Sequence, residues 1–92
     1  MTLPEIRESL SEAIRYVRSD RVEAERLTRG AADGLGGLAG KQTWLADQRR
    51  LERLERTAYA AAEALVVDPD AAAGGLKLVR HEIGLMTGGA EG

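Results

Sequence analysis

Apolar residues recur along the first third of the chain at alternating steps of three and four. The series is Leu3, Ile6, Leu10, Ala13, Val17, Ala24 and Leu27, with Ile14 beside it. This spacing places the whole series on one side of an α-helix. Thr2, Pro4 and Glu5 suit the start of that helix, because they supply an N-cap, a first-turn proline and a capping box. Gly30 suits its end, so the pattern predicts a helix over 3–29.

A second series with the same period consists of Trp44, Leu51, Leu54, Ala58, Ala61 or Ala62, and Leu65. It predicts a helix over 41–67, as long as the first. Asp68 and Pro69 then restart the chain, since aspartate caps a helix and proline fits its first position. A third helix over 69–87 carries its own apolar side, made of Ala72, Leu76, Val79, Ile83 and Met86.

Two helices of equal length joined by a short linker suggest an antiparallel hairpin. We therefore predict an all-α fold, a long antiparallel helical hairpin plus a shorter third helix, in one domain over 1–87 with a flexible tail over 88–92. Gly74 and Gly75 would allow close packing against the alanine-rich segment 60–62. Because such a hairpin leaves apolar surface uncovered, we expect it to assemble into a larger bundle. An extended dimeric coiled coil is an alternative topology.

The glycine-rich segment 30–40, GAADGLGGLAG, invites comparison with phosphate-binding motifs. A P-loop needs a glycine where Leu35 stands and a hydroxyl where Gln42 stands. The looser dinucleotide pattern is matched by Gly34, Gly36 and Ala39. That pattern has meaning only after a strand, and here a charged helix is predicted before it. We therefore interpret 30–40 as a connecting loop.

Three large apolar residues lie in or beside this segment, namely Leu35, Leu38 and Trp44. We expect the two leucines to fold over the open end of the hairpin, near Trp44 on the core side of the second helix. The alternative is a flexible binding tip with Trp44 as a partner anchor, because loops carry function and aromatic residues dominate binding hot spots.

Four polar residues interrupt the apolar sides of the hairpin: Asp20, Arg21, Asp47 and Gln48. Thr28 also falls on the apolar side of the first helix. In an antiparallel hairpin, these four residues would form one polar layer near the glycine-rich loop. We interpret it as a charge-paired layer that fixes register, or as a frayed and solvated end of the bundle, and an acid–base or ligand site is the alternative.

Composition narrows the range of functions. The 92 residues include no cysteine, which excludes disulfide frameworks, thiolate zinc sites and cysteine nucleophiles. The formal net charge is −2 and both signs are abundant, which gives no overall electrostatic reason to bind nucleic acid or an anionic membrane. No apolar run could span a bilayer, and the first residues lack a signal peptide. We expect a cytoplasmic protein without catalytic residues, a cofactor or a bound metal.

A basic stripe, Arg49, Arg53 and Arg56, lies opposite the apolar side of the second long helix. Such a stripe can bind along the phosphate backbone of a nucleic acid. Glu52 and Glu55 lie close by, and no aromatic residues interleave for base stacking. We therefore expect a solvated, salt-bridged surface, with weak nucleic-acid binding as a second alternative function.

The last helix has a second apolar side, formed by Leu78, His81 and Leu85. A helix that is apolar on two sides is buried on both or paired with another chain. Three helices leave no element to cover this side. We therefore predict a non-catalytic protein–protein interaction module, a small adaptor, regulator or structural subunit, that associates as a homodimer or higher oligomer.

His81, Glu82 and Ile83 are similar to the start of the phosphoacceptor box of sensor histidine kinases, whose domains are dimeric helical hairpins. The resemblance implies phosphotransfer on His81 as the alternative function. That box continues with arginine or lysine, a small polar residue and proline, whereas this chain has Gly84, Leu85 and Met86. Its histidine also lies on the first long helix. The sequence therefore assigns the chain to no family.

Overall fold

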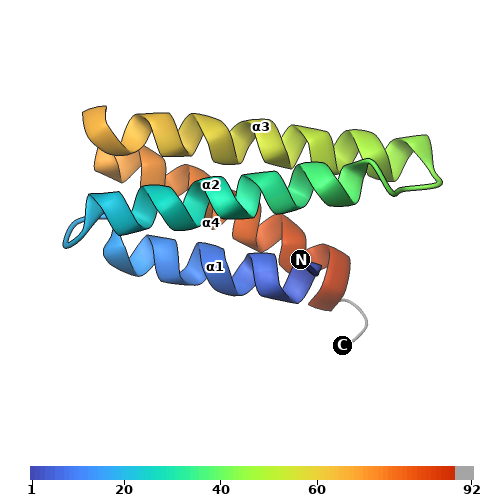
Figure 1. Cartoon of the computed structure of the whole chain (residues 1–92), viewed down its shortest axis with the longest axis horizontal. Helices are drawn as coiled ribbons and strands as arrows, with labels where there is room; N and C mark the ends of the chain where they lie inside the picture. The colour runs from blue at the N-terminus through green and yellow to red at the C-terminus, as the bar shows by residue number, and fades with distance from the viewer. Residues whose placement is uncertain (89–92) are drawn as a thin grey trace.

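The computed structural model describes residues 1–88, which form four α-helices and no strand. The helices are α1 (Leu3–Tyr16), α2 (Arg21–Ala39), α3 (Leu45–Val67) and α4 (Pro69–Gly88). They run alternately up and down in a body of 38 × 26 × 19 Å, with α1 and α3 each packed against both α2 and α4 (Figure 1). The predicted all-α class is confirmed, and the predicted number of helices is wrong.

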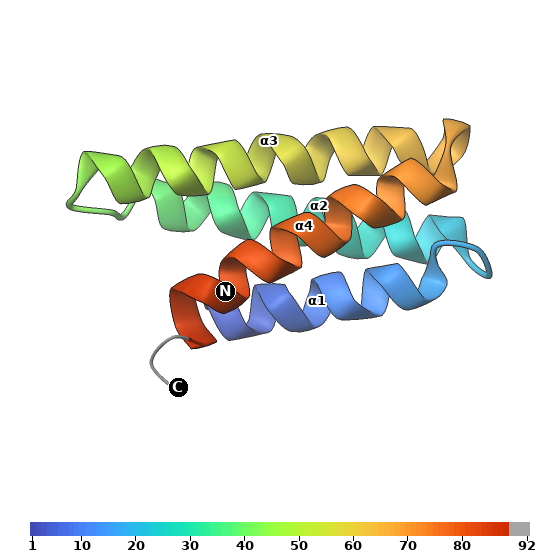
Figure 2. The ribbon, with the colours of Figure 1, turned by 180° about the vertical axis from the view of Figure 1, so that it is seen from behind.

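The last helix is inclined to the other three (Figure 2). It begins beside the end of α3 and ends beside the start of α1. An ion pair between Arg18 and Asp70 ties its first turn to the connection after α1. On its way from the end of α3 to the start of α1, α4 borders a groove with each of these two helices.

The start of α1 matches the expectation from sequence. The backbone N–H of Glu5 donates to the hydroxyl of Thr2 at 3.4 Å, and the backbone N–H of Thr2 donates to the carboxylate of Glu5 at 3.0 Å. This reciprocal capping box satisfies donors that the first helical turn would otherwise leave unpaired.

The predicted helix over 3–29 is wrong, because the chain turns back at residues 17–20. Asp20 caps α2, with its Oδ1 accepting a hydrogen bond from the backbone N–H of Glu23 at 3.1 Å. The apolar period continues across this turn, since Val17 and Ala24 are both buried. The pattern of apolar residues alone therefore did not reveal the break.

The predicted loop over 30–40 is also wrong, since α2 continues through Gly30 to Ala39 and the connection to α3 is only residues 40–44. The buried residues of α2 are mostly small: Ala24, Thr28, Ala31, Ala32, Leu35 and Ala39. The hydroxyl of Thr28 donates to the carbonyl of Ala24 at 2.7 Å, so its burial leaves no unpaired polar group. Small side chains let α2 approach its two neighbours closely.

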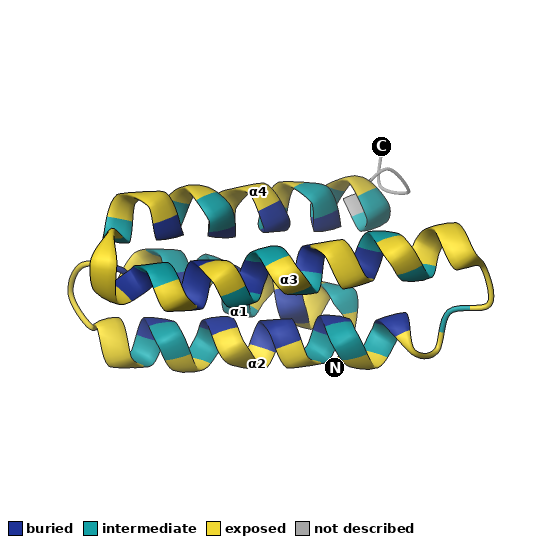
Figure 3. Ribbon diagram, turned by 90° about the horizontal axis from the view of Figure 1, so that it is seen from above, coloured by how far each residue is buried: buried dark blue, intermediate teal, exposed yellow. Residues whose placement is uncertain are grey.

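One core fills the space between the four helices (Figure 3). The apolar positions predicted for α3 are buried, namely Leu51, Leu54, Ala58, Ala61, Ala62 and Leu65. The positions Ala72, Leu76, Val79 and Ile83 of α4 are buried as well. Trp44 is the exception, because its side chain lies outside. The apolar sides of the four helices thus meet within one chain.

The junction between α3 and α4 follows the sequence signals. Oδ1 of Asp68 accepts a hydrogen bond from the backbone N–H of Ala71 at 3.2 Å, and Pro69 is the first residue of α4. A Cβ atom on Gly75 would lie 3.4 Å from the Cβ of Ala61, so the predicted close packing is confirmed there. Gly74 faces open space and plays no such part.

The end of the chain was predicted as a flexible tail over 88–92. Gly88 belongs instead to α4, and 89–92 lie outside the described residues. Among the residues that the structure does describe, no helix combines the length and the apolar character that a membrane crossing would require.

Candidate functional site

The second apolar side that the sequence predicts for the last helix is present on α4. Its core side carries Leu76, Val79 and Ile83, and its outer side carries Leu78, His81 and Leu85. Leu78 is 54% exposed and Leu85 is 56% exposed. The two leucines are seven residues apart, which is about 10 Å along a helix. They leave apolar surface in water that a partner could cover.

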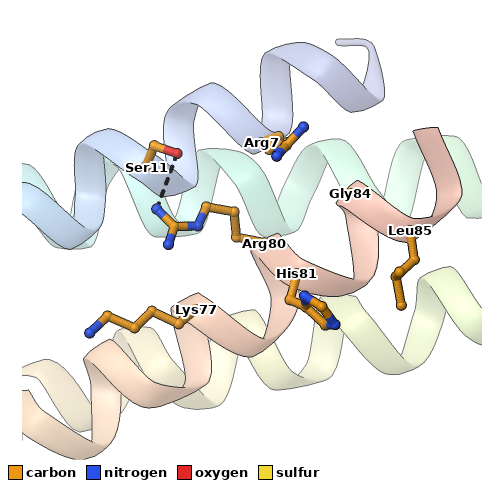
Figure 4. Close-up of a pocket in the computed structure, with 7 residues that line it drawn as sticks. All are labelled: Arg7, Ser11, Lys77, Arg80, His81, Gly84 and Leu85. Atoms are coloured by element: carbon orange, nitrogen blue, oxygen red, sulfur yellow. Dashed lines mark hydrogen bonds between the residues drawn. The ribbon is translucent and has the colours of Figure 1, made fainter. Parts of the chain in front are cut away.

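A hollow of about 490 Å³ lies between this outer side and α1 (Figure 4). Its walls are formed by Arg7 and Ser11 of α1, and by Lys77, Arg80, His81, Gly84 and Leu85 of α4. Nη1 of Arg80 donates a hydrogen bond to the hydroxyl of Ser11 across the hollow, at 3.5 Å. The inclination of α4 brings together residues that are about 70 positions apart in the chain.

Gly84 lines this hollow next to Arg7. A Cβ atom placed on Gly84 would lie 3.6 Å from Cζ of Arg7, so the guanidinium of Arg7 rests close to the backbone of α4. A Cβ atom here would make only an ordinary van der Waals contact with the guanidinium. Gly84 and Arg7 therefore pack side by side in the wall of the hollow.

The hollow is positively charged. Its walls carry Arg7, Lys77 and Arg80, and no acidic residue lines it. Within residues 1–88, ion pairs are formed by Arg18 with Asp70, Arg26 with Glu23, Arg29 with Glu25, and Arg50 with Glu82. The three cations of the hollow take part in none of these pairs. Glu8 is a near acidic neighbour, and it lines an adjacent hollow together with Arg7 and Ser11.

The other flank of α4 forms a smaller groove with α3, of about 330 Å³. Leu78 lines this groove together with Arg53 of α3, and Arg50 and Glu82 form an ion pair at 2.9 Å beside them. Leu85 also lines a hollow near the connection between α2 and α3, together with Leu38. The outer side of α4 is therefore an apolar ridge with cations on its α1 flank and with Arg53 and the Arg50–Glu82 ion pair on its α3 flank.

The other apolar residues predicted for an interaction surface lie in different places. Leu35 is fully buried on the core side of α2, so it neither covers a loop nor forms a binding tip. Leu38 is half-buried near the end of α2. Trp44 was expected on the core side, but it occupies the N-cap position of α3 and is 73% exposed. The structure therefore separates Trp44 from the core and leaves it accessible to a partner.

The predicted polar layer does not form. Asp20 and Arg21 lie where α2 begins, and Asp47 and Gln48 lie at the opposite end of the bundle, where α3 begins (Figure 1). Asp20 acts as a helix cap, and Arg21 is exposed rather than on the apolar side. The antiparallel hairpin had placed all four residues together, because it assumed that the first helix ran unbroken to residue 29.

The basic stripe on α3 is exposed, as the sequence predicted. Arg53 faces the groove with α4, and Arg49 and Arg56 are on the solvent side. Glu52 and Glu55 line a separate hollow between α3 and α2, together with Asp33. The bundle thus carries an acidic groove on its α2–α3 side and a basic hollow on its α1–α4 side.

Displaced pKa values occur away from the face of α4. The hydrogen bond that Tyr59 donates to Asp33 raises the pKa of the Tyr59 phenol, and the guanidinium of Arg26 lowers the pKa of Glu23. These shifts come from hydrogen bonds on α2 and α3. Among residues 1–88, no group of three histidine, cysteine or acidic side chains is placed to hold a metal ion.

Leu78, His81 and Leu85 were predicted from the sequence, whereas the cations of the hollow were not. Lys77, Arg80 and Gly84 follow helical spacing along one side of α4, and this signal was available in the sequence. The contribution of Arg7 was not available. With three predicted helices, nothing indicated that the first turns of the chain lie beside the last ones.

Together these features define a small four-helix bundle with one cationic, partly apolar face. Comparison with protein-family models, curated proteins and solved structures gives no match to this chain. Its function is therefore inferred from the chemistry of that face.

Proposed function

We propose that this chain is a non-catalytic interaction module, a small cytoplasmic adaptor, regulator or structural subunit that binds another protein through the outer side of α4. The observation that carries the proposal is the exposure of Leu78 and Leu85 on a helix whose opposite side already fills the core. Two aliphatic side chains two turns apart are the anchors that helix-in-groove recognition uses. Charged side chains on both flanks would surround them as a polar rim.

The test compares proteins captured by the wild-type chain with those captured by a Leu78→Glu/Leu85→Glu variant. The matched control is Val66→Glu/Val67→Glu, which alters two apolar residues of α3 that are 67% and 85% exposed. We expect a specific partner to be lost with the α4 variant and retained with the control. Equal capture by all three proteins would refute a role for this face.

Self-association is the form of the proposal in which the partner is a second copy. Light scattering after size exclusion, over a range of concentrations, distinguishes the two forms. A stable oligomer that Leu85→Glu dissociates would support pairing of copies through α4. A monomer at every concentration would direct the search to a different protein.

Phosphotransfer on His81 is a second candidate, favoured by the surroundings of that side chain. His81 is exposed and shares its hollow with Arg7, Lys77 and Arg80. Their charges would stabilise a phosphoryl group on the imidazole, since arginine and lysine are the usual partners of phosphate.

Acetyl phosphate provides the test of this second candidate. A ring nitrogen of His81 would form the N–P bond while the P–O bond to acetate breaks, with acetate leaving and the ring N–H proton passing to water. Mass spectrometry should then find an acid-labile phosphoryl group that a His81→Gln variant lacks. An unlabelled wild-type chain under conditions that label a known phosphoacceptor would exclude the activity.

A further inference from the structure

The positive charge beside the apolar ridge of α4 distinguishes this face from the rest of the molecule. The chain as a whole is acidic, with a formal net charge of −2, yet Arg7, Lys77 and Arg80 all line one hollow that has no acidic residue in its walls. Like charges brought together repel one another unless an anion neutralises them. The arrangement is therefore complementary to a negatively charged surface.

The shape of the face restricts what that surface can be. The hollow lies between two helices, and Leu85 is part of its wall, so apolar and cationic side chains adjoin each other. Leu78 continues the apolar ridge two turns earlier. A small anion would leave both leucines uncovered. A helix laid along α4 would cover them and bring its own flank over the cations.

A second copy of the same face fits poorly. A two-fold pairing with the two α4 helices antiparallel would bring Arg7, Lys77 and Arg80 of one copy toward the same residues of the other. Like charges across an interface oppose association and suppress such partners. The charge of this face therefore favours a different occupant.

We infer that the segment bound by α4 is an acidic amphipathic helix of a partner protein. Its apolar side would pack on Leu78 and Leu85, and carboxylates along one flank would pair with Arg7, Lys77 and Arg80. This inference rests on the proposed function, since it requires that the outer side of α4 bind a protein. It adds the chemistry of the partner.

Three synthetic peptides of the length of α4, 20 residues, test this inference directly. All three are stapled into helices and carry leucines at steps of three and four, and their flanking positions hold glutamate, glutamine or lysine. Fluorescence anisotropy measures their binding to the intact chain. We expect the glutamate peptide to bind most tightly and the lysine peptide most weakly, with about tenfold or more between the two.

Two charge-reversal variants show whether the hollow causes this ranking of the peptide affinities. Arg7→Glu/Arg80→Glu alters one residue on each wall and should abolish or reverse the order. Arg49→Glu/Arg56→Glu makes the same change in net charge on the solvent side of α3 and should preserve it. Arg7→Gln/Arg80→Gln, which only removes the charges, replaces the first variant if circular dichroism shows that the reversal unfolds the bundle.

Several outcomes would overturn the inference. The first is that the wild-type chain binds the three peptides with equal affinity. The second is that the ranking of affinities remains when Arg7 and Arg80 are replaced. The third is that the ranking remains in the Leu78→Glu/Leu85→Glu variant. Tighter binding of a labelled DNA duplex than of the glutamate peptide, or a dimer that Leu85→Glu disrupts, would assign the face to another occupant.

The proposed function can survive such a failure. If the Leu78→Glu/Leu85→Glu variant loses a cellular partner while the peptides show no charge order, the interaction module stands and the acidic helix is rejected. If the same variant loses no partner, the proposed function fails, whatever order the peptides show.

Discussion

Glycine has two different roles within α2. At Gly34 a Cβ atom would lie 3.1 Å from Cγ1 and Cδ1 of Ile6, a fully buried residue of α1, so the missing side chain permits close contact between the helices. At Gly36 a Cβ atom would overlap the carboxylate of Glu55, the far end of a flexible side chain. At Gly30 and Gly37 a Cβ atom would meet nothing within 4 Å beyond the local backbone of the helix. All four glycines lie within a helix, so none of them has to be explained by phosphate binding.

A Gly37→Ala substitution should stabilise the protein. The position is exposed within α2, and alanine favours a helix over glycine by about 1 kcal/mol. We expect the free energy of unfolding, measured by urea denaturation, to rise by about 0.5–1 kcal/mol.

Gly34→Ala is the matched control, because the same gain in propensity is opposed by contact with Ile6. It should give no gain or a loss. If Gly37→Ala left stability unchanged or lowered it, the helical state of residues 30–39 would be contradicted.

Trp44 should behave as an exposed side chain in solution. It is the chain's single tryptophan, so intrinsic tryptophan fluorescence reports on this position alone. With 73% of the residue exposed, we expect acrylamide to quench the folded protein nearly as efficiently as the urea-unfolded chain. If the folded protein were quenched much less than the unfolded chain, Trp44 would lie on the core side of α3, as the sequence predicted.

At the scale of an element, the decisive event is the break between α1 and α2. Asp20 separates two helices and caps the second, and an N-cap aspartate replaced by alanine costs about 1 kcal/mol. Asp20→Ala should therefore lower the free energy of unfolding by about that amount.

Within one unbroken helix the same substitution would have the opposite effect, because alanine has the higher helix propensity. Ser19→Ala, one residue earlier in the turn, serves as the control and should change stability much less. An increase in stability with Asp20→Ala would favour the long helix over 3–29.

The capping box of α1 should make stability depend on pH. The hydrogen bond from the backbone N–H of Thr2, with a second from its hydroxyl, lowers the pKa of Glu5 from its ordinary 4.5. A carboxyl whose pKa is lower in the folded state stabilises the protein above its unfolded pKa and loses that effect as the pH falls through the folded one.

Wild type should therefore exceed Glu5→Gln in unfolding free energy at about pH 7, and the difference should shrink below about pH 4. Glu8→Gln, one turn further along α1, is the control for a general loss of negative charge. A difference that stays constant from pH 7 to pH 3 would show that Glu5 acts without its charge.

At the scale of the molecule, breaking the first helix turns a hairpin into a closed bundle. In the predicted hairpin, the two long helices pack on each other and the last helix only adds to them. In the bundle, α4 packs against α1 and α3 and supplies Leu76, Val79 and Ile83 to the common core. The fold should therefore depend on α4.

A chain ending at Asp68 tests this dependence. Removing α4 would expose apolar surface on both α1 and α3, and we expect the far-ultraviolet circular dichroism of the truncated chain to lose its cooperative thermal transition. A matched truncation after Gly88 should retain it. Cooperative unfolding of the chain ending at Asp68 would show that the first three helices form a stable unit, as a hairpin would.

Much of the structure was determined by local sequence. Apolar residues at alternating steps of three and four predicted an all-helical fold. They also identified core residues as far apart in the chain as Ile6 and Ile83, because helical periodicity depends only on neighbours along the chain. The caps at Thr2 and Asp68 were likewise readable, since each acts within one turn. The outer leucines of α4 were found for the same reason.

Tertiary structure decided the rest. A continuous apolar period is compatible with one long helix or with two helices that face the same core, so the sequence did not reveal the turn before Asp20. Glycines 30–37 remain helical because small residues let α2 pack between α1 and α3, and this packing outweighs their low helix propensity. Arg7 joins Lys77 and Arg80 because α4 crosses to the start of α1. Contacts between distant parts of a chain depend on how helices pack, which local patterns do not encode.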